Sequence, residues 1–209
     1  MSRSAGKIKR CLQYVYYYLN AKRIMMFHFK KELFIRGRWF QGEKYGALTA
    51  PGWKWVVNDY YACKRMRQNT DIPWPCSPRI SVFCPNNIEF HPDDLNNFQG
   101  FGNYFQAIGR IVIGRGTYIA PNVGIITANH SVFQLDLHNQ PKQVTIGEKC
   151  WIGMNSIVLP GVTLGDRTIV GAGSIVTKSF PDGYCVIAGN PAKIIKVLDS
   201  ENLNNDGEI

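Results

Sequence analysis

A six-residue period in the second half of the chain constrains the fold more than any other feature. Read in sixes from residue 146, the second position is Gly in four of six hexads, and the fifth is small or β-branched in five. An earlier block, residues 113–125, follows the same template. A period of six matches neither an α-helix nor a strand alternation, so it predicts a solenoid. The first position is aliphatic six times in succession: Ile146, Ile152, Val158, Leu164, Val170 and Val176.

In such a solenoid each hexad forms one flat side of a coil, and three hexads make one triangular turn. The aliphatic first residue and the small fifth residue point inward, while Gly and polar residues turn the corners, where a missing Cβ permits tight or positive-φ geometry. No coil buries its apolar face alone, so the coils stack. We therefore expect an all-β solenoid over residues 76–197. A basic, partly helical extension, residues 1–75, precedes it, and a polar tail, residues 198–209, follows.

The period fails between Ile125 and Ile146, which lie 21 residues apart, a distance that six does not divide. A solenoid tolerates an insertion at a corner because lengthening a loop costs little entropy, so residues 131–144 are predicted to form an extruded loop. Its apolar residues, including Phe133, need a covering surface, either an adjacent subunit or a substrate. His130 stands at the root of this loop. From position alone it is either a hydrogen-bonded corner residue or a neutral base.

Three stretches of the chain resemble a known family: "IAPNVGIITANH", "VTIGEKCWIGMNSIVLPGVTLGDRTIVGAGSIVTK" and "VIAGNPAKIIK". They are similar to the hexapeptide-repeat acyltransferases, and most similar to the maltose, galactoside and polysaccharide O-acetyltransferase branch. The resemblance implies a left-handed parallel β-helix, acetyl-CoA as the acyl donor, no metal, and a saccharide hydroxyl as the acceptor. It also implies that His130 is the general base of a direct transfer, without a Cys or Ser nucleophile.

The same resemblance assigns roles to further residues. On the acceptor side it implies Asn103 as a polarising amide, and Asp136 and His138 as contacts of the loop with a sugar. On the donor side, Trp151 would project from a corner along the pantetheine arm, and three small residues would leave their backbone amides open to coenzyme A. The family assembles as a homotrimer with its sites between neighbouring solenoids. The remaining donor-side residues implied are Gly153, Gly171, Ala172, Thr177, Lys178 and Lys193.

Three other functions remain possible from the sequence. The first keeps the fold but acetylates an amine, such as an amino-sugar nucleotide or a xenobiotic. The second is a metal-dependent solenoid of the γ-carbonic anhydrase type, which needs a histidine triad on neighbouring strands and which the four widely spaced histidines do not match. The third is a non-catalytic scaffold, against which His130 argues. The six cysteines are scattered without a CxxC pair, which is typical of reduced core thiols rather than a zinc site.

The basic charge is concentrated in the N-terminal third of the chain. Residues 1–70 hold 15 Lys or Arg and 3 Asp or Glu, a net charge of +12, whereas the remainder is slightly acidic. Residues 7–20 show a helical apolar stripe. We expect this region either to cap the open end of the solenoid or to contact an anionic membrane through residues 1–70. No nucleic-acid motif accompanies the charge, and the start of the chain lacks a signal-peptide pattern, so a cytoplasmic or peripheral inner-membrane location is expected.

Overall fold

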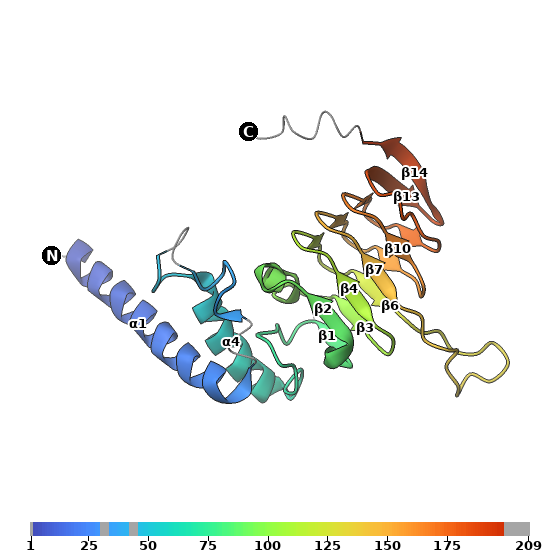
Figure 1. Cartoon of the computed structure of the whole chain (residues 1–209). Helices are drawn as coiled ribbons and strands as arrows, with labels where there is room; N and C mark the ends of the chain where they lie inside the picture. Colours follow the sequence, from blue (N-terminus) through green and yellow to red (C-terminus); the bar gives the residue numbers. More distant parts are fainter. Residues whose placement is uncertain (1, 30–33, 42–45, 199–209) are drawn as a thin grey trace. The chain divides into compact units, whose positions relative to one another are not determined.

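The computed structural model describes residues 2–29, 34–41 and 46–198, and the chain divides into two compact units, residues 1–78 and 79–209 (Figure 1). The polar tail expected from residue 198 onward therefore lies, except for Leu198, outside the described residues.

The N-terminal unit is built on two helices, α1 (Ser2–His28) and α4 (Pro51–Met66). Pro51 suits the first position of α4, where its missing N–H costs nothing, and α4 ends at Arg67 in the left-handed region, with φ of 54°. The ring of Tyr18 on α1 meets the ring of Trp53 on α4 edge to face, with centroids 5.1 Å apart. The residues that form this core are Ala21, Ile24 and Met25 of α1 and Trp53, Val56 and Val57 of α4.

Helix α1 is longer than the segment 7–20 that the sequence stripe predicted, and the stripe does not face the core of its unit. Ile8, Leu12 and Leu19 expose 62%, 65% and 59% of their surface, whereas the buried residues lie on another face of the helix. The stripe therefore predicted the helix correctly but not the face that packs. Within the described residues, neither helix combines the length and the apolar character needed to cross a bilayer.

The C-terminal unit is the predicted solenoid, made of short strands in three sheets (Figure 1). The first sheet has the strand order β1-β3-β6-β9-β12, the second β10-β7-β4-β2, and the third β14-β13-β11-β8-β5. The first sheet contains β1 (Ser81–Phe83), β3 (Tyr104–Gln106), β6 (Gly124–Ile126), β9 (Ile157–Val158) and β12 (Ile175–Val176). The second contains β2 (Ile88–Phe90), β4 (Ile111–Ile113), β7 (Val144–Ile146) and β10 (Thr163–Leu164). The third contains β5 (Tyr118–Ile119), β8 (Trp151–Ile152), β11 (Ile169–Val170), β13 (Cys185–Gly189) and β14 (Ala192–Val197).

From β3 to β12 the chain visits the three sheets in turn, so each coil in this part adds one parallel strand to each sheet. Ile125, for example, pairs with Val158, which pairs with Val176, and the side chains of all three are buried. The fifth residue of each hexad is buried too, and where it is Ser or Thr its hydroxyl donates to a corner carbonyl: Thr168 donates to the Gly165 carbonyl at 2.7 Å. The all-β parallel β-helix predicted from the period, with an N-terminal helical extension, is confirmed.

The corners use glycine differently from the prediction. The second-position glycines of the hexads do not have positive φ; that conformation occurs at the fourth position, for example at Lys149 (φ 53°), Asn155 (φ 61°) and Arg167 (φ 54°). Glycine at the second position is required by space instead. A Cβ on Gly147 would lie 2.6 Å from the backbone nitrogen of Asp166 in the next coil. The close stacking of coils, rather than the turn itself, selects these glycines.

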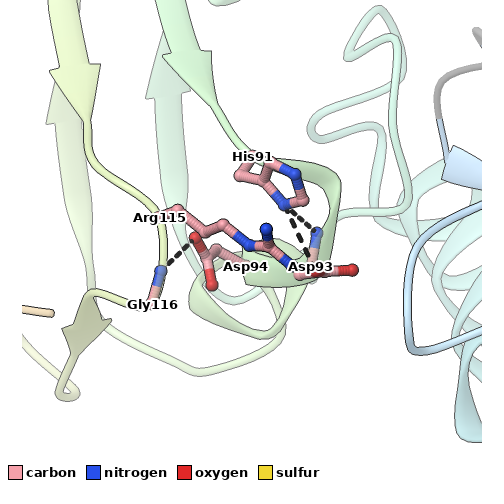
Figure 2. Close-up of polar contacts among 5 residues, drawn as sticks. All are labelled: His91, Asp93, Asp94, Arg115 and Gly116. Atoms are coloured by element: carbon pink, nitrogen blue, oxygen red, sulfur yellow. Dashed lines mark hydrogen bonds and ion pairs between the residues drawn. The ribbon is translucent and has the colours of Figure 1, made fainter. Parts of the chain in front are cut away.

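The first coil lacks a regular strand in the third sheet and has two 3-10 helices, η1 (Pro85–Asn87) and η2 (Pro92–Phe98). Polar contacts fasten η2 to the second coil (Figure 2). The Arg115 guanidinium lies 2.8 Å from Asp93 Oδ2, and the Gly116 N–H donates to Asp94 Oδ2 at 2.9 Å. The Asp93 N–H donates to Nδ1 of His91, which caps η2. Side chains thus replace the missing ladder here, which explains why the period is weak in this stretch.

The last strand, β14, runs opposite to the other strands of the third sheet. β14 pairs antiparallel with β13, whereas the other paired strands of the solenoid are parallel. Gly189 takes φ of 104° at the turn, and β14 exposes Lys193 and Lys196 together with Ile194, Ile195 and Val197.

Candidate active site

The chain leaves the solenoid between β6 and β7 and forms an ordered hairpin that extends from the coils (Figure 1). Three backbone hydrogen bonds hold its two arms together: Lys142 N–H to the Thr127 carbonyl, Asn139 N–H to Asn129, and Ser131 N–H to Leu137, each at 2.8 Å. The tip is apolar and exposed. Phe133 exposes 94% of its surface and Leu135 72%. Nothing in the described part of the chain covers these side chains, so they are available to a substrate or another subunit.

The root of this hairpin is tied to the neighbouring coil by Gln106 at the end of β3. Its side-chain oxygen accepts hydrogen bonds from the Thr127 and Ala128 N–H groups, at 3.1 and 3.0 Å. The Thr127 hydroxyl donates to the Gln106 carbonyl and accepts from the Gly109 N–H. Thr127 and Ala128 are buried, so the segment just before His130 is rigid. Sequence analysis missed Gln106, because a glutamine in a weak early repeat is indistinguishable from a solvated one.

His130 stands on the first arm of the hairpin, exposed to solvent. Its Nδ1 lies 2.6 Å from the Leu135 carbonyl oxygen. A carbonyl only accepts, so Nδ1 carries the proton in this bond. In the neutral ring, the other nitrogen, Nε2, is then unprotonated and can accept a proton. The hairpin therefore fixes the tautomer that a general base requires, and it does so with a backbone carbonyl.

His138 lies beside His130 on the opposite arm. The two residues form an antiparallel bridge, and their ring centroids are 4.2 Å apart with planes tilted by 36°. Two histidines eight positions apart in the sequence thus share one face of the hairpin. Asp136 is exposed between them on the same loop. This pairing could not be predicted from the sequence, because it depends on the register of the hairpin.

Asn103 occupies a different environment from the acceptor-side loop. It immediately precedes β3, and its side chain is 2% exposed. Its Oδ1 is buried and has no hydrogen-bond partner among the described residues. An amide in this position has an unsatisfied acceptor but no open path to a ligand. A role for Asn103 against a bound acceptor remains a prediction.

The donor-side residues are distributed over two sheets. Trp151 begins β8 in the third sheet, in register between Tyr118 and Ile169, and exposes 55% of its surface. It projects from a strand, not from a corner as the sequence suggested. Lys193 is exposed on β14 of the same sheet.

Thr177 and Lys178 instead follow β12, at the corner between the first and second sheets. Both are exposed, and the Lys178 ammonium lies 5.6 Å from the Phe180 ring centroid. The hairpin with His130 leaves this same corner after β6, and β6, β9 and β12 are successive strands of the first sheet. Within a single chain, Thr177 and Lys178 therefore lie at the same corner of the solenoid as the hairpin, two coils further along. Trp151 and Lys193 lie on the third sheet instead.

The prediction that Gly153 and Gly171 leave their amides open to a ligand is wrong. The Gly153 N–H donates to the Val170 carbonyl and the Gly171 N–H to the Ile187 carbonyl, both at 2.8 Å. A Cβ on Gly153 would lie 2.5 Å from the Val170 oxygen, and one on Gly171 would lie 2.9 Å from the Ala188 Cβ. Both glycines serve the stacking of coils. Ala172 is exposed at the corner between β11 and β12.

The two buried cysteines of the solenoid, Cys150 and Cys185, are poorly suited to nucleophilic chemistry. Burial raises the pKa of the Cys150 thiol, and burial also raises that of Cys185. Of the six thiols, Cys11 and Cys84 are exposed, so the expectation of core thiols holds for four. Among the described residues, no group of three or more His, Cys, Asp or Glu side chains is placed to hold a metal ion.

Comparison with known proteins identifies the repeat. Residues 143–178 match the family described as "Bacterial transferase hexapeptide (six repeats)". Residues 143–178 thus carry the repeat of this transferase family. The family resemblance inferred from the sequence is thereby confirmed.

Several known proteins are similar to this chain. The galactoside O-acetyltransferase of Escherichia coli is 37% identical over 97 residues, 44% of this chain and 46% of that protein. A solved galactoside acetyltransferase in complex with coenzyme A matches 91% of this chain and 84% of its own, with a TM-score of 0.53 and 24% identity, a likeness of fold. A maltose O-acetyltransferase from Clostridium difficile 630 is 38% identical over 47% of this chain and 54% of its own, with a TM-score of 0.45. The chain spans about half the length of the curated relatives it matches.

Proposed function

We propose that this protein is an acetyl-CoA-dependent O-acetyltransferase that acts in the cytoplasm. Its acceptor would be a hydroxyl group of a saccharide, or of a polysaccharide or lipid-linked glycan precursor. The observation that carries the proposal is the hydrogen bond from His130 Nδ1 to the Leu135 carbonyl, which leaves Nε2 ready to accept a proton. The 37% identical relative named galactoside O-acetyltransferase supports the acceptor class.

In the proposed reaction, His130 Nε2 removes the proton from the acceptor hydroxyl while that oxygen attacks the thioester carbonyl carbon. The tetrahedral intermediate collapses with cleavage of the C–S bond. His130 then returns the proton to the departing sulfur, so that the products are the acetyl ester and the free thiol of coenzyme A. The Nδ1–Leu135 bond persists throughout and stabilises the imidazolium that forms between the two proton transfers. No covalent enzyme intermediate is needed, in agreement with the raised pKa of the Cys150 thiol.

The acceptor side of this site is assigned to the hairpin. His138 lies 4.2 Å from His130 ring to ring, so an acceptor hydroxyl within reach of His130 Nε2 would also lie close to the His138 ring. We infer that His138 contacts the acceptor or holds the His130 ring in orientation. Asp136, exposed on the same loop, is the second candidate for a sugar hydroxyl.

The donor side is proposed to be completed by another copy of the chain. Trp151 and Lys193 lie on the third sheet, whereas His130, Thr177 and Lys178 belong to the corner between the first and second. A homotrimer with sites between solenoids would let the third sheet of one copy face the hairpin corner of the next. It would also cover the apolar hairpin tip, where Val132 and Phe133 are 82% and 94% exposed.

The proposal is tested by release of free thiol from acetyl-CoA in the presence of a panel of sugars, nucleotide sugars, glycans and primary amines. We expect a hydroxyl acceptor to stimulate release and His130→Ala to lower turnover by ~10²–10⁴ while acetyl-CoA still binds by calorimetry. Near-wild-type turnover in that variant would refute the mechanism. Stimulation by amines alone would replace O-acetylation with N-acetylation.

A further inference from the structure

Helix α1 of the N-terminal unit combines an unusual charge with an unpartnered apolar face. Residues Ser2–His28 include six Lys or Arg and no Asp or Glu. The five basic residues whose side chains the structure describes, Lys7, Lys9, Arg10, Lys22 and Arg23, are all exposed. The acetyl-transfer proposal uses no part of this helix, so the inference below is independent of it.

Five apolar residues of α1 outside its core contact form one line, which we call the α1 stripe. Their spacing of four, three, four and seven residues keeps them within about 60° of one another at 100° per residue. The buried residues of α1, such as Ala21 and Met25, lie on the opposite side of the helix. The α1 stripe consists of Ile8, Leu12, Val15, Leu19 and Met26, and all but the half-buried Val15 are 59–65% exposed.

Two cations and a tyrosine border this stripe. At 100° per residue, Lys22 and Arg23 fall on either side of it, so their charged ends can extend away from an apolar layer that the stripe enters. Tyr16, 52% exposed, lies next to Arg23 around the helix. A tyrosine ring with an apolar body and a polar tip suits the boundary between lipid and water.

Two occupants can cover such a face: copies of the helix or a lipid surface. The four–three spacing would suit a helical bundle. In a bundle, however, each copy would bring six cations and no anion against its neighbours, which would repel one another. An anionic bilayer supplies both the apolar layer and the opposite charge. We propose that α1 binds the surface of an anionic membrane, lying in its plane with the α1 stripe at the acyl boundary and the basic residues on lipid phosphates.

Flotation of the full chain with vesicles tests the proposal. We expect binding to vesicles of phosphatidylcholine mixed with phosphatidylglycerol but not to phosphatidylcholine alone, and weaker binding as the salt concentration rises. Leu12→Asn with Leu19→Asn should reduce partitioning about a hundredfold, because each leucine loses its burial in the acyl boundary. The matched control, Leu48→Asn with Met66→Asn, changes two exposed apolar residues of the same unit outside α1 and should stay within a few-fold of wild type.

Charge reversal provides the second arm. Lys22→Glu with Arg23→Glu should remove the preference for anionic vesicles, and far-UV circular dichroism would verify that the helix content is unchanged. Equal binding to both kinds of vesicle, or insensitivity to the stripe substitutions, would overturn the proposal. If the stripe substitutions instead lower the molar mass in sedimentation equilibrium without affecting vesicle binding, the stripe is an interface between copies of the chain.

Discussion

Gln106 offers the sharpest test of how the solenoid positions the hairpin. Substitution Gln106→Leu removes the oxygen that accepts from Thr127 N–H and Ala128 N–H. These residues are 0% and 2% exposed, so water reaches the orphaned donors poorly. A buried donor without a partner costs about 1–3 kcal/mol, which gives about 2–6 kcal/mol for the pair. Because the Gln106 side chain is itself half-buried, we expect the lower half of that range.

The same substitution should lower activity, since the loosened root lies just before His130. A misplacement of about 1 Å can cost a factor of about 100 in rate, so we expect kcat/KM to fall ~10- to 100-fold with little change in the KM for acetyl-CoA. The matched control is Gln106→Glu, whose carboxylate still accepts both bonds and should stay within a few-fold of wild type. Urea denaturation and steady-state thiol release measure the two effects. If the Leu and Glu variants behave alike, the hydrogen bonds of Gln106 do not position the hairpin.

Two further outcomes concern the solenoid and the thiols. Gly153→Ala should lower the free energy of unfolding in urea by about 3 kcal/mol, because its Cβ would meet backbone atoms at 2.5–2.7 Å that cannot move aside. The control Gly124→Ala, whose Cβ would have its nearest atoms 3.7 Å away, should change the free energy of unfolding by less than about 1 kcal/mol. Similar values for both variants would contradict the packing argument. A thiol reagent at neutral pH should react quickly with Cys11 and Cys84 only, since the other four thiols are buried. Burial also raises the pKa of Cys63 to about 11. Rapid reaction of all six thiols without denaturant would contradict this prediction.

The period predicted the solenoid because every coil repeats the same two inward positions, and that requirement is local. It predicted the corners only in part: Gly116, Gly161 and Gly173 do turn corners with positive φ, whereas the second-position glycines do not. The glycines at the second position appear in the sequence as turn residues, but Lys149 and Arg167 take the left-handed conformation while Gly147 and Gly153 make room for the next coil. Close approach between coils is a tertiary property. The sequence therefore shows that glycine is present at these positions but not that a neighbouring coil requires it.

The site was predictable where it depended on the break in the period and not where it depended on hairpin register. The lost register located His130 at the root of the hairpin, and the family resemblance, not the period, implied its role as a base. Its partner is a backbone carbonyl, that of Leu135, and any residue type could supply one. The contact between His130 and His138 depends on which residues face each other across the hairpin arms. The helical stripe shows a related limit. Ile8 and Leu19 predicted a helix correctly, but periodicity does not distinguish an apolar face that packs inside the unit from one that is exposed.

The reversal of the chain at β14 has a consequence for the size of the molecule. A parallel stack of near-identical coils has no inherent length, because its last coil presents the same edge that every earlier coil presented to its successor. β14 replaces that edge in its sheet with an antiparallel strand, whose hydrogen-bond spacing no longer matches an incoming coil, and Lys193 and Lys196 add charge to it. The hairpin of β13 and β14 therefore ends the parallel ladder of the third sheet, so that this edge is a poor template for a further coil.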